Sequence, residues 1–285
     1  MGKIVRSFFF VSLIFLQVPS GRILAQEKVE DGKTGIVQSR IVLTVSESKR
    51  LIGKAVAQMS IVKKALNKGM VIIAKGTTNT YVAEEILGQT IEKGAYVIGR
   101  VYPTKGGKKL KPSRKLPEIV LINGKVAKGL SLKDAVEKLK PGDVVIKGAN
   151  ALDYKNKTAG VYIGGSNGGT TGTFMPYVVA RKAYLVIPVG LEKLVAENVV
   201  DLSLKMREPV VSIDWMPSMF LLTGEIVTEI EALKILTGIS AFQVGAGGIG
   251  GAEGAVHLLL RGSKEQVKRS LELVKDIQGE PPFVE

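Results

Sequence analysis

Apolar and polar positions along the chain predict helices that alternate with buried strands. Residues 46–69 predict one helix with the N-cap Ser46, apolar side chains at helical spacing and an end at Gly69. Residues 70–88 predict a strand buried on both faces, a polar turn and a helix that ends at Gly88. This order is half of a β-α-β unit.

The same alternation continues toward residue 195. Short strands are expected in "AYVIGRVYP" (95–103), "EIVLING" (118–124), "DVVIKGANALD" (143–153) and "YLVIPVG" (184–190). Helices are expected at 131–142 and in "YVVARKA" (177–183). We therefore expect an α/β fold with an open, mainly parallel, Rossmann-like sheet.

Two domains follow from this pattern, an α/β ligand-binding domain at 40–199 and a smaller α+β domain at 200–285. The second contains the strand "PVVSIDW" (209–215), helices at 228–238 and 263–277, and two strands that flank "GAGGIGG" (245–251). That stretch fits G-x-G-x-x-G, but a strand follows it, so we expect no dinucleotide site. His257 in that strand is expected to be a packed, hydrogen-bonded residue.

Residues 1–25 read as a signal peptide or an N-terminal anchor. Lys3 and Arg6 precede the uncharged stretch "SFFFVSLIFLQV", and Ala25 suits the residue before a cleavage site. Cleavage predicts an exported protein, periplasmic or extracellular. Retention predicts membrane association through this segment.

The amino-acid composition limits which kinds of catalytic and metal site the chain can form. The 285-residue chain has no cysteine and one histidine, which excludes disulfides, thiolate chemistry and a multi-histidine metal site. We expect no cofactor and no metal. The net charge is +14, and residues 100–117 hold seven basic residues and no acid. This stretch predicts a basic loop for an anionic ligand or lipid, or a solvated surface; nucleic acid is not expected, because no nucleic-acid motif accompanies the charge.

Three polar, glycine-containing turns are expected at the carboxyl edge of the sheet, where open α/β sheets bind ligands. They are "KGTTNT" (75–80), "KGANALD" (147–153) and "GGSNGGTTGT" (164–173). Free amides at a helix start favour an anion. The predicted ligand-binding residues are Lys75, Gly76, Thr77, Thr78, Asn79, Asn150, Gly168, Gly169, Thr170, Thr171, Gly172 and Thr173. Ordinary helix capping and surface turns are the alternative interpretation.

The stretch "VIIAKGTTNTYVAEEIL" is similar to the phosphate-binding strand, turn and helix of ribose-5-phosphate isomerase A and its relatives, which include CoA transferases. "KGANALD" resembles that isomerase's Asp-Gly-Ala-Asp-Glu-Val-Asp segment, with Lys147 and Asn150 in place of two acids. The resemblance covers about residues 65–190. It implies Asp153 as a catalytic base, with Lys147 holding phosphate or stabilising an enediolate oxygen.

Three functions remain open from the sequence. The first is binding of a phosphorylated or other anionic small molecule, with isomerase-like or acyl/CoA-transferase-like turnover. The second is a non-catalytic binding or sensing protein outside the cytoplasm. The third is a peripheral-membrane scaffold that uses the N-terminal segment and the basic stretch. We leave open whether the chain forms a homo-oligomer.

Overall fold

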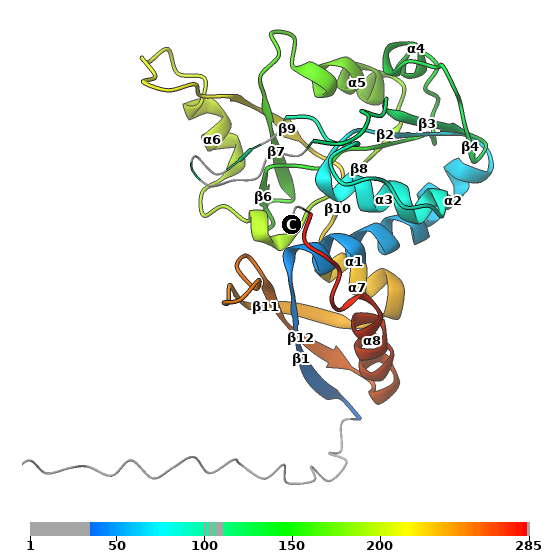
Figure 1. Ribbon diagram of the computed structural model, residues 1–285, viewed down its shortest axis with the longest axis vertical. Helices are drawn as coiled ribbons and strands as arrows, with labels where there is room; N and C mark the ends of the chain where they lie inside the picture. Colours follow the sequence, from blue (N-terminus) through cyan, green and yellow to red (C-terminus); the bar gives the residue numbers. More distant parts are fainter. Residues whose placement is uncertain (1–34, 100, 103–104, 106–110, 284–285) are drawn as a thin grey trace, which may run out of the picture. The chain divides into compact units, whose positions relative to one another are not determined.

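The structure is a computed structural model that describes residues 35–99, 101–102, 105 and 111–283 (Figure 1). The expected signal peptide at 1–25 and part of the basic stretch at 100–117 lie outside the described residues. Within the described part of the chain, no helix is long and apolar enough to cross a membrane.

The main sheet has six strands in the order β10-β8-β5-β2-β3-β4. Its four parallel strands are β2 (Met70–Ile73), β5 (Val144–Ile146), β8 (Tyr184–Pro188) and β10 (Glu225–Val227). At one edge, β3 (Ile119–Ile122) and β4 (Lys125–Val126) are antiparallel. The fold is therefore α/β with a mixed sheet. All four residues of β2 are buried, as the apolar run at its position predicts.

The described chain has eight α-helices (Figure 1). They are α1 (Val45–Gln58), α2 (Ser60–Asn67), α3 (Thr77–Leu87), α4 (Leu132–Val136), α5 (Gly169–Ala180), α6 (Val199–Lys205), α7 (Glu229–Thr237) and α8 (Lys264–Ile277). A short 3-10 helix covers Leu191–Lys193. Helix α1 packs against both α3 and α7.

The single helix expected at 46–69 is wrong, because Met59 has an extended ψ of 135° that separates α1 from α2. Its N-cap is Thr44 and not Ser46. The Thr44 hydroxyl accepts a 3.3 Å hydrogen bond from the Glu47 amide, while the Glu47 carboxylate accepts one of 2.8 Å from the Thr44 amide. This reciprocal capping box satisfies two free amides at once.

Two smaller antiparallel sheets accompany the main one. The first joins β6 (Ala151–Asp153), β7 (Thr158–Ile163) and β9 (Ser218–Leu222). The second has the order β1-β12-β11 and contains β1 (Val37–Leu43), β12 (Val256–Gly262) and β11 (Ser240–Ala246). The sheets do not divide the chain at residue 200, because β10 joins the main sheet and β1 pairs with β12.

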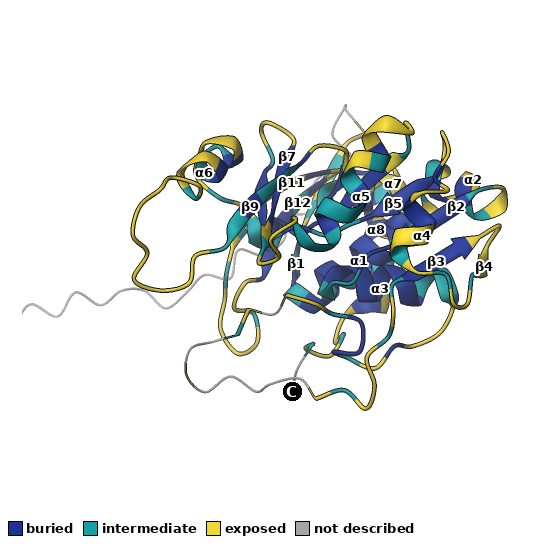
Figure 2. Ribbon diagram, turned by 90° about the horizontal axis from the view of Figure 1, so that it is seen from above, coloured by how far each residue is buried: buried dark blue, intermediate teal, exposed yellow. Residues whose placement is uncertain are grey.

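Several expected elements differ from the structure. The described residues of 95–103 contain no strand, and residues 209–215 form an exposed segment without strand pairing (Figure 2). The strand expected at 143–153 is two strands, β5 and β6. The turn at 247–255 joins β11 to β12 without a helix, as expected, and the His257 ring nitrogen Nε2 lies at 2.9 Å from the Gly247 carbonyl oxygen.

A partly buried ion network ties the end of the described chain to α1 and α3. Arg50 lies within hydrogen-bond distance of Glu84 at 2.6 Å, Glu85 at 3.0 Å and Glu280 at 2.9 Å. Only 16% of the Arg50 side chain is exposed. A guanidinium group offers several donors in a fixed plane, so one residue can hold three carboxylates.

Candidate functional site

The carboxyl ends of the four parallel strands carry a group of charged side chains. Lys75 follows β2, Lys147 follows β5, Lys193 follows β8, and Glu229 follows β10. Because these strands run in one direction, the segments that follow them lie at one edge of the sheet. This edge is where the sequence predicts a ligand site.

Asn79 on α3 joins the ends of two neighbouring strands. Its side-chain amide donates to the carbonyl oxygens of Ala74 at 2.6 Å and Ile146 at 3.2 Å. Its Oδ1 atom is buried and accepts no hydrogen bond from the described residues. A Cβ atom added to Gly148 would lie 3.7 Å from this oxygen. The free oxygen therefore faces the segment that follows β5.

Lys147 and Lys193 bring two amines to this edge. The Lys193 amine donates a 2.8 Å hydrogen bond to the Ala149 carbonyl oxygen. The Lys147 amine forms no hydrogen bond or ion pair with another described residue. Burial and, to a lesser extent, the nearby Lys193 charge lower the Lys147 pKa to about 8. Burial also lowers the Lys193 pKa.

Lys49, Glu192 and Glu229 extend the group toward α1 and α7. The Lys49 amine lies 4.0 Å from Glu192 Oε1. Glu229 is completely buried and its Oε2 accepts a 2.9 Å hydrogen bond from the Leu191 amide. Burial, with the neighbouring Glu192 charge, raises the Glu229 pKa to about 7, whereas burial lowers the Lys49 pKa to about 8.

We call Lys49, Lys147, Glu192, Lys193 and Glu229 the carboxyl-edge cluster. Both carboxylate oxygens of Glu192 are buried without a hydrogen-bond donor among the described residues, and the Ser48 hydroxyl is the neighbouring donor of the Glu229 carboxyl. Buried polar atoms almost always have partners, so these atoms make the cluster a candidate binding site. No three His, Cys, Asp or Glu side chains of the described residues gather as metal ligands would.

Some of the predicted ligand residues lie at this edge. Lys75 pairs with Glu118 at 3.8 Å. Gly76 precedes the first residue of α3, and Thr77 begins that helix. Thr78 is buried, and its hydroxyl has no partner among the described residues. These positions confirm that the first turn follows a parallel strand and opens a helix.

The other two predicted site residues of the "KGANALD" segment, Asn150 and Asp153, form hydrogen bonds in and beside the small sheet of β6, β7 and β9 instead. The Asn150 side-chain oxygen accepts a 3.1 Å hydrogen bond from the Tyr162 amide on β7. Asp153 accepts hydrogen bonds from the Asn156 amide at 3.0 Å and from its side chain at 2.8 Å. These bonds hold the turn between β6 and β7, and they lower the Asp153 pKa. The structure therefore gives Asp153 a turn-forming position outside the carboxyl-edge cluster.

The third expected turn does not follow a parallel strand, and that prediction is wrong. The stretch 164–173 follows β7, whose two neighbours are both antiparallel to it. Gly168 has a φ of +82°, and α5 begins at Gly169, eight residues before the expected helix.

The rest of this stretch forms the first turn of α5. A Cβ atom on Gly172 would lie 2.0 Å from the Asn167 carbonyl oxygen, so the backbone packs too closely there for a side chain. Thr171 is buried, and the Thr173 hydroxyl donates a 3.1 Å hydrogen bond to the Gly169 carbonyl. Thr170 is the second residue of α5, between Gly169 and Thr171. The glycines thus permit a close helix start.

Sequence reasoning missed Lys49, Glu192, Lys193 and Glu229. A signal for two of them was present, because residues 184–190 predict a buried strand and "LEK" follows at 191–193. Segments that follow parallel strands meet at one edge of the sheet, and this rule, used above for 75–80 and 147–153, places Glu192 and Lys193 at the same edge. Lys49 had no such signal, since it lies within α1 and reaches the edge only through helix packing.

Comparison of the chain with protein-family models, with curated proteins and with solved structures gave no match. The residues and their geometry therefore carry the functional argument.

Proposed function

We propose that the carboxyl edge binds a small anionic molecule, phosphorylated or carboxylated, and transfers protons on it. The observation that carries the proposal is the carboxyl-edge cluster, in which the charges of Glu192 and Glu229 act on Lys49 and Lys193, and Lys193 acts on Lys147. Lys49 and Glu229 are buried, and the other three side chains are half-buried. Lys75 pairs with Glu118, whose charge also acts on Lys147. The raised Glu229 pKa leaves part of that carboxyl uncharged near neutral pH, so the amines of the cluster favour an anion. A bound anion offsets the cost of burying these amines.

Lys147 is the residue best placed to hold the anion. Its amine has no protein partner in the described structure, and its neighbour Gly148 has no side chain to cover it. Lys193, held by Ala149, adds a second charge. Lysine is a common ligand of phosphate as a point charge.

Glu229 is the proposed general acid and base, in place of Asp153. A proton-transfer group works best when its pKa lies near the working pH, and the Glu229 pKa of about 7 satisfies this condition. Asp153 has a lowered pKa and is occupied by Asn156. Removal and return of a proton beside a carbonyl group is the reaction class that fits, and a protonated lysine would stabilise the negative oxygen that develops.

We keep the relationship to the ribose-5-phosphate isomerase A and CoA-transferase superfamily, and a Rossmann-like description of the sheet, as part of this proposal. The order of β2, the Lys75–Thr77 turn and α3 supports it. Export through residues 1–25 rests on the sequence alone. A non-catalytic anion-binding protein outside the cytoplasm is the second candidate, and a turnover assay separates the two.

The binding test measures the melting temperature with inorganic phosphate, ribose 5-phosphate and acetyl-CoA. At least one of these anions should raise the melting temperature of the wild-type protein by mass action. Lys147→Met should lose this rise, whereas Lys155→Met, a change at an exposed turn lysine, should keep it. If no anion stabilises the wild-type protein, or if Lys147→Met responds as the wild type does, the proposal is wrong.

The turnover test follows deuterium uptake from D₂O into the stabilising ligand by NMR. Wild-type protein should exchange a carbon-bound proton, and Glu229→Gln should bind the ligand without exchange. Binding with no exchange in the wild-type protein supports the non-catalytic candidate and excludes the catalytic role of Glu229.

A further inference from the structure

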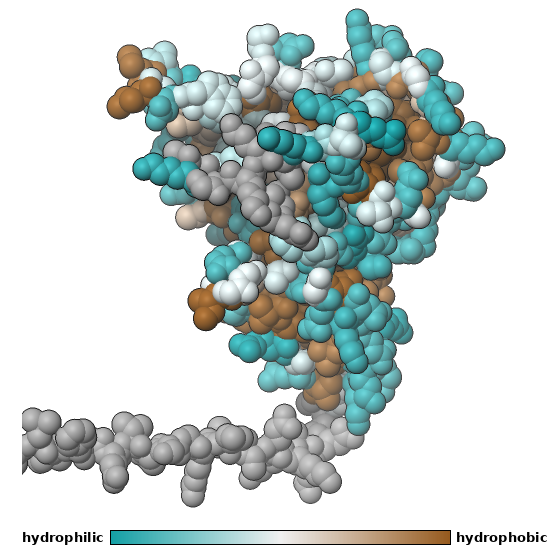
Figure 3. All heavy atoms as spheres, in the orientation of Figure 1, coloured by the Kyte–Doolittle hydropathy of each residue, from teal (hydrophilic) through white to brown (hydrophobic). Residues whose placement is uncertain are grey.

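Residues 209–217, which precede β9, form an exposed segment that we call the apolar finger. Val211 is 97% exposed, Ile213 101% and Trp215 75%. Val210 and Met216 are also exposed. Hydrophobic side chains gather at such an exposed tip beside α6 in the space-filling view (Figure 3). Single exposed apolar residues are common, but a continuous group of this kind marks an interaction surface.

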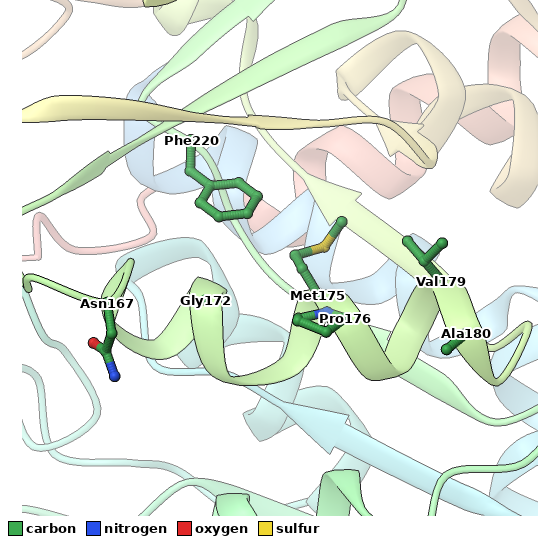
Figure 4. A pocket seen from close by; sticks show the side chains of 7 residues that line it. All are labelled: Asn167, Gly172, Met175, Pro176, Val179, Ala180 and Phe220. Atoms are coloured by element: carbon green, nitrogen blue, oxygen red, sulfur yellow. The ribbon is translucent and has the colours of Figure 1, made fainter. Parts of the chain in front are cut away.

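An apolar groove lies between α5 and β9 (Figure 4). It has a volume of about 580 Å³. Its lining residues are apolar except Asn167 and comprise Asn167, Gly172, Met175, Pro176, Val179, Ala180 and Phe220. Val179 is 70% exposed. The exposed side chains of α5 are Pro176, Val179 and Ala180, all of them apolar, and an apolar helix face normally packs against a partner.

The charges around the two features are complementary. Residues 197–214, which include most of the finger, hold four acidic and two basic residues in a chain whose net charge is +14. Residues 164–182, which include α5, hold Arg181 and Lys182 and no acidic residue. Both basic side chains are exposed at the end of α5. Asp214, the one charged residue of the finger, is therefore complementary to Arg181 and Lys182 at the end of the groove, and it matches an anionic membrane poorly.

The finger and the groove belong to one surface. A Cβ atom on Gly164, in the segment that leads to α5, would lie 3.2 Å from the Trp215 ring. Phe220 lines the groove and belongs to β9, the strand that follows the finger. A two-fold axis near this surface lets each of two copies place its finger in the other's groove, as an isologous interface requires.

We propose that the apolar finger of one copy of this chain docks into the groove between α5 and β9 of a second copy, and that the chain is a dimer through this exchange. The bulky finger side chains, with Trp215 as the anchor, fill the groove. Asp214 faces the Arg181 end of the partner groove and sets the orientation. The proposal is independent of the carboxyl-edge cluster.

Sedimentation velocity of the purified full chain tests the exchange. The wild-type protein should sediment as a dimer at micromolar concentration, and the double variant Ile213→Ser, Trp215→Ser should be a monomer with an unchanged circular dichroism spectrum, because both side chains are exposed. The matched control Ile249→Ser removes a side chain that is 90% exposed in another loop and should stay dimeric. A monomeric wild type, or a dimeric double variant, overturns the proposal.

A charge exchange tests the orientation. Arg181→Glu and Asp214→Lys should each raise the dimer dissociation constant by about tenfold. The double variant should return the dissociation constant to the wild-type value, because an acidic side chain at position 181 then faces a basic side chain at position 214. Absence of restoration overturns the assigned orientation. Monomeric wild-type protein that binds phosphatidylglycerol vesicles through Trp215 would instead identify the finger as a membrane contact and overturn the proposal.

Discussion

The amine of Lys193 donates a 2.8 Å hydrogen bond to the carbonyl oxygen of Ala149. This bond ties the segment after β8 to the segment after β5 and brings two amines, those of Lys147 and Lys193, to one edge of the sheet. Each charge disfavours the other, and burial adds to the cost. Other interactions of the fold must therefore hold these two amines together, and this pair of neighbouring amines is the basis of the binding proposal.

Replacement of Lys147 by Met should stabilise the protein while removing anion binding. Burial disfavours the ammonium form, so at pH 7 we expect a gain on the order of 1–3 kcal/mol in the free energy of unfolding. The lowered pKa of about 8, against 10.5, means that wild-type stability rises between these pH values, because the unfolded chain binds the proton more tightly there. Lys147→Met should lose this rise, as urea titrations at several pH values would show. The exposed change Lys155→Met should show neither effect.

Glu229→Gln should weaken the dependence of the free energy of unfolding on pH below neutrality. Since its pKa is raised from 4.5 to about 7, the folded protein holds a proton that the unfolded chain has lost, and wild-type stability should fall as the pH rises through this window. The glutamine keeps an oxygen for the Leu191 amide and carries no charge. Thermal melts from pH 4 to pH 8 would measure the slope, and Glu225→Gln, at an exposed carboxylate, should leave it as in the wild type. An unchanged slope in Glu229→Gln would contradict the raised pKa.

Arg50→Met should strongly destabilise the fold. It leaves the carboxylates of Glu84 and Glu280 partly buried without their main cation, a change that costs about 3–5 kcal/mol when buried pairs are broken. Lys54→Met removes one partly exposed ion pair, with Glu85 at 3.6 Å, and should cost no more than about 1 kcal/mol. Chemical denaturation of both variants makes the comparison. Equal losses would show that the Arg50 network adds no stability.

Gly172→Ala should damage the start of α5. The added methyl group would lie 2.0 Å from the Asn167 carbonyl oxygen, so the backbone must shift, and overpacking of this kind costs about 1–3 kcal/mol. Thr170→Ala in the same turn has no such contact and serves as the control. If Gly172→Ala melts at the wild-type temperature, the close packing of this helix start is not required for the fold.

The sequence by itself determined much of the secondary structure and the part of the candidate site that precedes α3. Buried apolar runs predicted β2, β3 and β8, and the turn before α3 was correctly placed after a parallel strand. Local signals suffice there, because a strand buried on both faces needs a continuous apolar run and a helix start needs a short polar turn. The same signals failed at 209–215, where an apolar run predicted a strand but the residues form an exposed segment.

Only the tertiary structure decided which charges meet. Lys49, Glu192 and Glu229 come from α1, from the segment after β8 and from α7, and their neighbours depend on strand order and on the packing of α1 against α7. The stretch 164–173 shows the converse, since its glycines and threonines are typical of a ligand loop and yet form a close helix start beside an antiparallel sheet. Strand β7 runs antiparallel to β6 across the short turn at 154–157, and antiparallel to β9, which comes more than fifty residues later. Local composition carries no information about the second pairing, because of its separation in the sequence.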